Sequence, residues 1–194
     1  GLNKLWNLKL DQKKLCALAS MLGSDIPFFI NGGIQLCFGR GEILEKLDLK
    51  LEYGVLLLKN PNVSVSTALT YKKYSNKFCH QYLTNKELIE NKRKNLRDNG
   101  LERLNFNYRH FSIKNDLQLI VEHDNDSVKQ ALNLFSKLNN CLTFSMSGSG
   151  PTCFALFKDV DTAKKVLKEN YKLFKDNGYD SWVCTFLEKG ITFV

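Results

Sequence analysis

Residues 146–152, Met-Ser-Gly-Ser-Gly-Pro-Thr, are the segment of this chain whose residue types most clearly suggest chemistry. Two apolar runs flank the segment. Gly148 and Gly150 can adopt positive φ without steric penalty, and small residues leave backbone amides open to an anion. The segment therefore predicts a phosphate-binding loop. A plain hairpin turn is the alternative, because glycine and serine fill ordinary hairpin loops for the same backbone reasons.

Two better-known glycine loops do not fit this segment. No Gly-x-x-x-x-Gly-Lys-Ser/Thr spacing begins at Gly148, and no third glycine follows where a dinucleotide-binding fold needs one. The residues after the loop, 152–157, form a compact apolar run typical of a strand, whereas both of those motifs open a helix.

Asp25 is the second candidate for a chemical role. The pattern predicts a helix with an Asp11 N-cap and a stop at Gly23, so Asp25 lies just past the helix end. Phe28 and Phe29 follow, and a carboxylate is costly to bury in apolar surroundings unless it is paired or used. A functional carboxylate and a turn aspartate bonded to its own backbone are both compatible with this segment.

The elements expected around these candidates indicate two parts. Residues 28–30 and 34–38 predict a hairpin across Asn31-Gly32-Gly33, which belongs with the first helix. From residue 53 the pattern predicts strand, helix, strand, strand, helix, strand, which is the ferredoxin-like order. The expected strands are 55–58, 142–146, 152–157 and 182–187, and the expected helices start at 67 or span 127–138 and 162–174.

Three motifs in this order resemble the GHMP small-molecule kinases: Gly-Ser-Asp-Ile-Pro-Phe-Phe at 23–29, Gly-Arg-Gly-Glu at 39–42, and the glycine loop at 146–152. The resemblance runs from Gly1 to the terminus and includes 61–67 and the closing Gly190-Ile191. It is closest to members that phosphorylate a cytidyl diphospho-methylerythritol in non-mevalonate isoprenoid biosynthesis.

The resemblance implies an α+β fold. Residues 1–50 would be the C-terminal part of a ribosomal-S5-like N-terminal GHMP kinase domain. Residues 51–194 would be the ferredoxin-like C-terminal domain.

The resemblance also implies a reaction, the transfer of the γ-phosphoryl of ATP, with Mg²⁺, to a hydroxyl of a small cytidyl diphosphate substrate. Asp25 matches the family's proposed general base. Gly148, Ser149 and Gly150 match the motif that shapes the phosphate site through backbone amides and a serine hydroxyl. Thr67 and Tyr71 match positions that contact the cytidine portion, although Tyr71 is equally compatible with a helix residue packed on the core.

Family members also carry an N-terminal lysine-bearing segment and a Gly/Ser-rich loop that cradles the ATP phosphates. Neither occurs in these 194 residues, and the first residues resemble a helix entered in midstream. We therefore expect a fragment of roughly the last two thirds of a kinase, inactive alone. Uncovered apolar side chains should make it self-associate. Those side chains are Phe28, Phe29, Leu36 and Phe38.

Composition further narrows the class of protein to which this chain can belong. No apolar stretch approaches the ~18 residues of a membrane span, and no signal peptide starts the chain. The six cysteines are scattered singly, mostly in apolar runs, which predicts reduced core thiols in a cytoplasmic or plastid-like compartment. No cysteine or histidine cluster suggests a metal site.

The formal net charge of +8 leaves a further alternative open. Basic residues gather at 86–114 and alternate with aromatic ones, as in a single-strand nucleic-acid binder. Acidic residues are interspersed there, so a solvated helical face is favoured, with steering of an anionic substrate as a secondary role.

Overall fold

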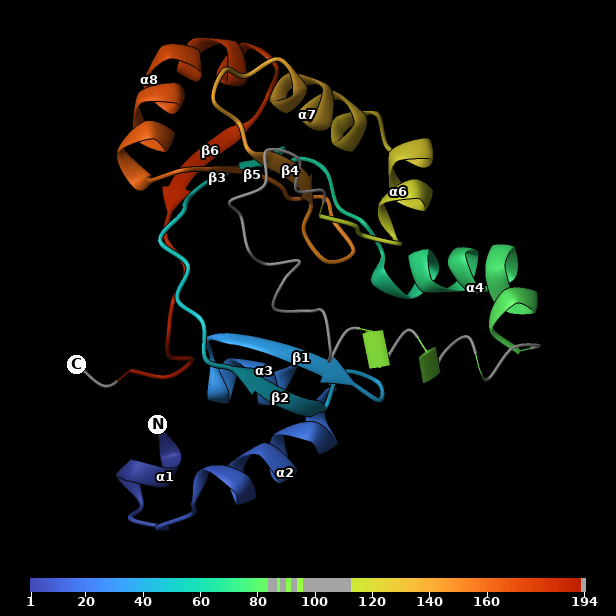
Figure 1. Ribbon diagram of the computed structural model, residues 1–194, viewed down its shortest axis with the longest axis vertical. Helices are drawn as coiled ribbons and strands as arrows, with labels where there is room; N and C mark the ends of the chain where they lie inside the picture. Colours follow the sequence, from blue (N-terminus) through green and yellow to red (C-terminus); the bar gives the residue numbers. More distant parts are fainter. Residues whose placement is uncertain (84–86, 88–89, 92–93, 96–112, 193–194) are drawn as a thin grey trace. The chain divides into compact units, whose positions relative to one another are not determined.

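The computed structural model describes residues 1–83, 87, 90–91, 94–95 and 113–192 (Figure 1). The chain divides into two compact units. Unit 1 comprises Gly1–Leu51 with Phe186–Val194, and unit 2 comprises Glu52–Thr185. The expected division lay between residues 50 and 51. The two units differ from it because Phe186–Val194 belongs with unit 1. The assignment of the two parts to kinase domains stays a prediction.

Unit 2 contains a four-stranded sheet in the order β4-β5-β3-β6, with every neighbouring pair antiparallel. The central strand β3 has an unbroken apolar run, which suits a strand that has partners on both sides. The register pairs Leu58 with Cys153, and Cys153 in turn with Met146. The strands are β3 (Gly54–Lys59), β4 (Thr143–Met146), β5 (Cys153–Phe157) and β6 (Asp180–Cys184).

Two helices, α7 (Asp126–Ser136) and α8 (Val160–Asp176), pack on the same face of this sheet (Figure 1). Each begins at a side-chain cap: Asn125 Oδ1 accepts from the amide of Val128 at 3.1 Å, and Asp159 Oδ1 accepts from that of Thr162 at 2.7 Å. Their apolar faces meet the sheet in one core whose largest fully buried side chains are aromatic. Among these are Phe135, Phe157, Phe174 and Tyr179.

The predicted ferredoxin-like order is therefore confirmed in unit 2, and the chain is α+β. Two more helices, α4 (Thr67–Leu83) and α6 (Gln118–Asp124), precede α7 in the chain and contact each other. The Ser66 hydroxyl caps the first turn of α4 by accepting from the amide of Leu69 at 3.3 Å. The helix expected from residue 67 onward is thus confirmed.

Unit 1 contains α1 (Leu2–Leu5), α2 (Gln12–Leu22) and α3 (Ile26–Asn31), followed by β1 (Ile34–Phe38) and β2 (Ile43–Leu47). The Asp11 cap of α2 is confirmed, because its Oδ1 accepts from the amide of Lys14 at 2.7 Å. Gly23 follows the last residue of α2 as expected.

The predicted hairpin across Asn31-Gly32-Gly33 is wrong. Residues 28–30 lie in α3, and β1 pairs instead with β2 across the turn at 39–42. Pro27 explains the difference, since proline has a fixed φ suited to the first turn of a helix. An apolar run of three residues is too short for its periodicity to separate helix from strand.

The prediction of core cysteines holds for one residue. Cys153 is fully buried, and burial raises the pKa of its thiol to about 12. Cys37 and Cys184 are exposed, and the other three are half-buried. Among the described residues, every helix is too short or too polar to cross a bilayer.

Candidate functional site

The predicted phosphate loop connects β4 to β5, and it has the form of a hairpin connection. Its ends are joined by a hydrogen bond from the Ser147 amide to the Thr152 carbonyl at 2.8 Å. Gly148 and Gly150 have φ values of +55° and +82°, in the left-handed region that glycine tolerates best. A hairpin and a loop with open amides are therefore compatible here, since one backbone provides both.

The top of this loop is open. Within the described part of the chain, the amides of Gly148 and Ser149 donate no hydrogen bond, whereas the Gly150 amide donates to the Ser147 carbonyl at 2.9 Å. A Cβ added to Gly148 would meet nothing within 4 Å. Two adjacent donors that face unfilled space are the arrangement by which backbone loops bind anions.

The N-terminal end of α4 adjoins the loop. The Thr67 hydroxyl lies 2.7 Å from that of Ser149, although the two residues are 82 positions apart in the sequence. A helix N-terminus carries partial positive charge and adds to the attraction that the loop amides exert on an anion. The structure thus brings together a residue predicted to contact substrate and a residue predicted to bind phosphate.

Tyr71 lies one turn further along the same face of α4 as Thr67. Its side chain is 58 % exposed, so it does not pack in the core of unit 2. The exposed ring leaves a π-face free for stacking, as the substrate role requires.

Two residues that the sequence reasoning did not single out hold the loop in place. The Asn115 side-chain amide donates to the carbonyls of Met146 and Gly148 at 2.7 and 2.8 Å. Gln118 Oε1 accepts from the Met146 amide and from the Ser145 hydroxyl, both at 2.9 Å. Gln118 is the first residue of α6, and Asn115 lies in the segment just before it. Their sequence signal was only local, because neither residue type marks a contact with a loop about 30 residues further along the chain.

Asp25 lies in unit 1, between α2 and α3. Its carboxylate is exposed, and Oδ1 accepts a hydrogen bond from the Ser24 hydroxyl at 3.3 Å. The turn at 39–42 lies beside it, since a Cβ on Gly41 would be 3.2 Å from Asp25 Oδ1. Burial, and secondarily the charge of Asp25, raises the pKa of the Cys37 thiol. The carboxylate is therefore accessible to a ligand. That it faces the same cleft as the glycine loop stays a prediction.

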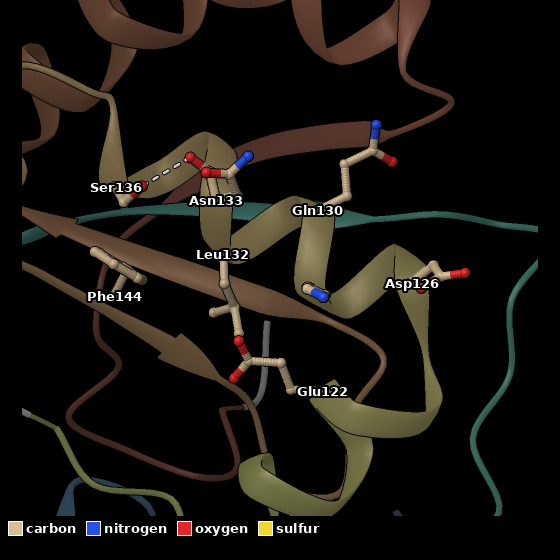
Figure 2. Close-up of a pocket in the computed structure, with 8 residues that line it drawn as sticks. Glu122, Asp126, Gln130, Leu132, Asn133, Ser136 and Phe144 are labelled. Carbon is tan, nitrogen blue, oxygen red and sulfur yellow. Dashed lines mark hydrogen bonds between the residues drawn. The ribbon is translucent and has the colours of Figure 1, made fainter.

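A separate cavity of about 740 Å³ lies against α6 and α7 and contains none of the predicted site residues. In Figure 2, Asp126 and Gln130 direct their polar ends away from Phe144, and Glu122 lies below Leu132. Across the described segments, no group of three or more His, Cys, Asp or Glu is arranged to hold a metal ion.

Most of the basic zone at 86–114 lies outside the described residues, which include only 87, 90–91, 94–95 and 113–114 of it. The nucleic-acid alternative stays untested.

Comparison with known proteins identifies the family. A family model described as "GHMP kinases C terminal" matches residues 86–176. The 4-diphosphocytidyl-2-C-methyl-D-erythritol kinase of Prochlorococcus marinus strain AS9601 is 81 % identical over 194 residues, which are 100 % of this chain and 62 % of that protein. Residues 86–176 of this chain therefore belong to the GHMP kinase family. The chain spans less than two thirds of the length of the curated relatives that it matches.

Two solved structures share the fold with this chain. A 4-(cytidine 5'-diphospho)-2C-methyl-D-erythritol kinase has a TM-score of 0.57 and 22 % identity, over 94 % of this chain and 59 % of that one. A homoserine kinase from Cytophaga hutchinsonii has a TM-score of 0.56 and 20 % identity, over 98 % of this chain and 62 % of that one. At these identities the likeness concerns the fold alone.

Proposed function

We propose that the protein to which these residues belong transfers the γ-phosphoryl of ATP to the 2-hydroxyl of 4-diphosphocytidyl-2-C-methyl-D-erythritol, in non-mevalonate isoprenoid biosynthesis. One observation carries the proposal: Thr67 meets Ser149 beside the open amides of Gly148 and Ser149. The name of the 81 % identical relative supports the choice of substrate.

The glycine loop would hold phosphate oxygens of ATP. Transfer of a phosphoryl group depends mainly on positioning and on neutralising charge, and backbone amides do both without having to reorganise. The Ser149 hydroxyl, already bonded to Thr67, links the loop to the side on which substrate would bind.

Asp25 would act as general base. The substrate oxygen attacks the γ-phosphorus, the bond from that phosphorus to the bridging oxygen of ADP breaks, and the hydroxyl proton passes to the carboxylate. General base catalysis of this kind contributes about 10² to 10⁴ in rate. The carboxylate of Asp25 is exposed and accepts only a hydroxyl hydrogen bond within the described residues, so it retains acceptor capacity.

Tyr71 and Thr67 would contact the cytidine portion of the substrate. Base stacking on an aromatic side chain is worth about 1 to 3 kcal/mol in nucleic-acid complexes, and the exposed ring of Tyr71 is free to provide it.

Mg²⁺ would enter with ATP. This ion is usually held by substrate phosphates, waters and one or two carboxylates, and the lack of a dense acidic cluster among the described residues is compatible with that mode.

The test is a full-length hybrid in which these 194 residues replace the matching part of the 81 % identical relative. We expect ATP-dependent phosphorylation of the cytidyl substrate, measured as ADP release. Asp25→Asn should lower kcat by about 10² to 10⁴. The matched control Asp48→Asn changes another exposed carboxylate of unit 1 and should leave kcat unchanged. Equal rates for the two variants would reject Asp25 as the base.

The substrate class is tested separately with Tyr71→Ala. Loss of stacking should raise KM for the cytidyl substrate by about tenfold or more with little change in KM for ATP. Faster turnover of homoserine, mevalonate or galactose than of the cytidyl substrate would reject the substrate while leaving the kinase assignment in place.

A further inference from the structure

The side chain of Asn115 hydrogen-bonds to the glycine loop, although the loop lies more than 30 residues further along the chain. Its Nδ2 donates to two carbonyls that belong to the end of β4 and to the loop, those of Met146 and Gly148, at 2.7 and 2.8 Å. Its Oδ1 accepts from the Leu117 amide at 3.0 Å, and its own carbonyl accepts from the Gln118 amide at 3.1 Å. The residue thus lies in the turn that leads into α6, and its side chain also holds the glycine loop.

The orientation of this side-chain amide follows from its partners. Two carbonyls can accept only from the NH₂ group, and the Leu117 amide can donate only to the carbonyl oxygen. A flipped amide would place its oxygen against both loop carbonyls and lose every one of these bonds. Asparagine therefore satisfies all three partners at once. The carboxylate of the similarly shaped aspartate has no hydrogen to donate to the carbonyls.

The direction of the loop amides depends on these two bonds. A peptide unit is planar, so fixing the Gly148 carbonyl inward fixes the Ser149 amide of the same unit in the opposite direction. Gly148 has φ of +55°, and a Cβ added to it would meet nothing within 4 Å, so no neighbour packs on that side of the residue. Within the described residues, Asn115 is the side chain that restrains it.

We propose that Asn115 is a positioning residue of the phosphate loop, which turns the Gly148 carbonyl away from the ligand so that the Ser149 amide faces an incoming phosphate. The proposal rests on the proposed function and deepens it. Asn115 does not touch the ligand. It acts through the backbone, by keeping a carbonyl oxygen from facing the anion.

The experiment uses the full-length hybrid, labelled with ¹⁵N-glycine so that the Gly148 amide is followed directly. Asn115→Ala removes both donors without adding charge, and Asn115→Asp removes them while nearly keeping the shape. The control is Asn170→Asp on α8, where the side-chain amide also donates to a backbone carbonyl, that of Val166 at 2.9 Å. Inorganic tripolyphosphate is the probe.

In the wild type and in Asn170→Asp, we expect one Gly148 resonance that shifts as tripolyphosphate is added. In both Asn115 variants that resonance should move or broaden before any ligand is present. Affinity for tripolyphosphate should fall about tenfold, the scale of two ordinary hydrogen bonds. Glycine resonances elsewhere should stay in place, which separates a local change from general loss of structure.

Gly148 resonances and affinities equal to those of Asn170→Asp in both Asn115 variants would overturn the proposal. If the wild type phosphorylates its substrate in that case, the proposed function stands and only the role of Asn115 is rejected. A wild type that binds no tripolyphosphate would overturn both this inference and the phosphate role of the loop.

Discussion

Gly148 and Gly150 are both glycines with positive φ, but the structure requires glycine for different reasons at the two positions. Around Gly148 a side chain would have open space, so only backbone strain opposes one. At Gly150 a Cβ would lie 2.7 Å from the sulfur of Met146, a side chain that is itself buried. The first glycine leaves open space above the loop, and the second lets the loop pack on the core.

This contrast predicts unequal costs for the same substitution. Gly148→Ala should lower the free energy of unfolding by about 1 kcal/mol, the cost of a left-handed alanine. Gly150→Ala should lower it by about 3 kcal/mol, because overpacking against Met146 adds to the strain. Urea denaturation of the two variants measures the difference. Equal losses would show that the loop relaxes away from Met146.

At the scale of elements, β4 is an edge strand whose end is completed by a helix rather than by another strand. Gln118 of α6 accepts the Met146 amide and the Ser145 hydroxyl, which sheet pairing leaves without an acceptor. Ser145 is fully buried, and its hydroxyl bond to Gln118 is shorter than the one it makes to the Met146 carbonyl at 3.4 Å. The contact ties α6 to the strand that leads into the glycine loop.

Gln118→Leu should therefore destabilise unit 2. It leaves the Met146 amide without its acceptor and removes the shorter of the two bonds made by the buried Ser145 hydroxyl, and a buried group without a partner costs about 1 to 3 kcal/mol. We expect the free energy of unfolding to fall by about 2 to 4 kcal/mol and the Met146 amide to exchange faster with deuterium. The control Gln12→Leu breaks an exposed side-chain hydrogen bond and should change stability by less than about 0.5 kcal/mol. A loss no larger than that of the control would mean that water replaces Gln118.

At the scale of the whole chain, the apolar surface of unit 1 favours self-association. Met21 and Leu22 on α2 are 82 % and 83 % exposed, and Phe29 on α3 is 65 % exposed. Of the four residues expected to be uncovered, Phe29 is exposed, whereas Phe28, Leu36 and Phe38 are half-buried. Exposed apolar side chains of unit 1 therefore lie on α1 and α2 as well as on α3, earlier in the chain than the sequence pattern indicated.

We predict that the 194-residue chain forms dimers or larger species through this part of α2. Met21→Lys combined with Leu22→Lys should shift the mass toward the monomer, because burying two ammonium groups in an apolar contact is unfavourable. Leu173→Lys on α8 changes a leucine that is 45 % exposed in the other unit, and this control should leave the mass unchanged. Light scattering over a dilution series measures the mass. A wild-type monomer at the highest concentration would contradict the prediction.

Local patterns in the sequence were sufficient to predict the sheet of unit 2 and the helices that pack on it. Its strands and the helices α4, α7 and α8 follow from apolar runs, caps and turn residues that act within a few positions, whereas α6 was not predicted. The glycine loop was found in the same way, because its conformation depends on the glycines themselves.

The partners of that loop come from far along the chain, and only the folded structure identifies them. Thr67 reaches Ser149 across 82 residues, and Asn115 reaches Gly148 across 33. The hairpin wrongly predicted at residues 28–38 failed for a local reason, because Pro27 suits the first turn of a helix and β1 pairs with β2 across the next turn. Hydrogen bonds between distant residues leave no periodic trace in a sequence, because each depends on where the intervening elements place two side chains.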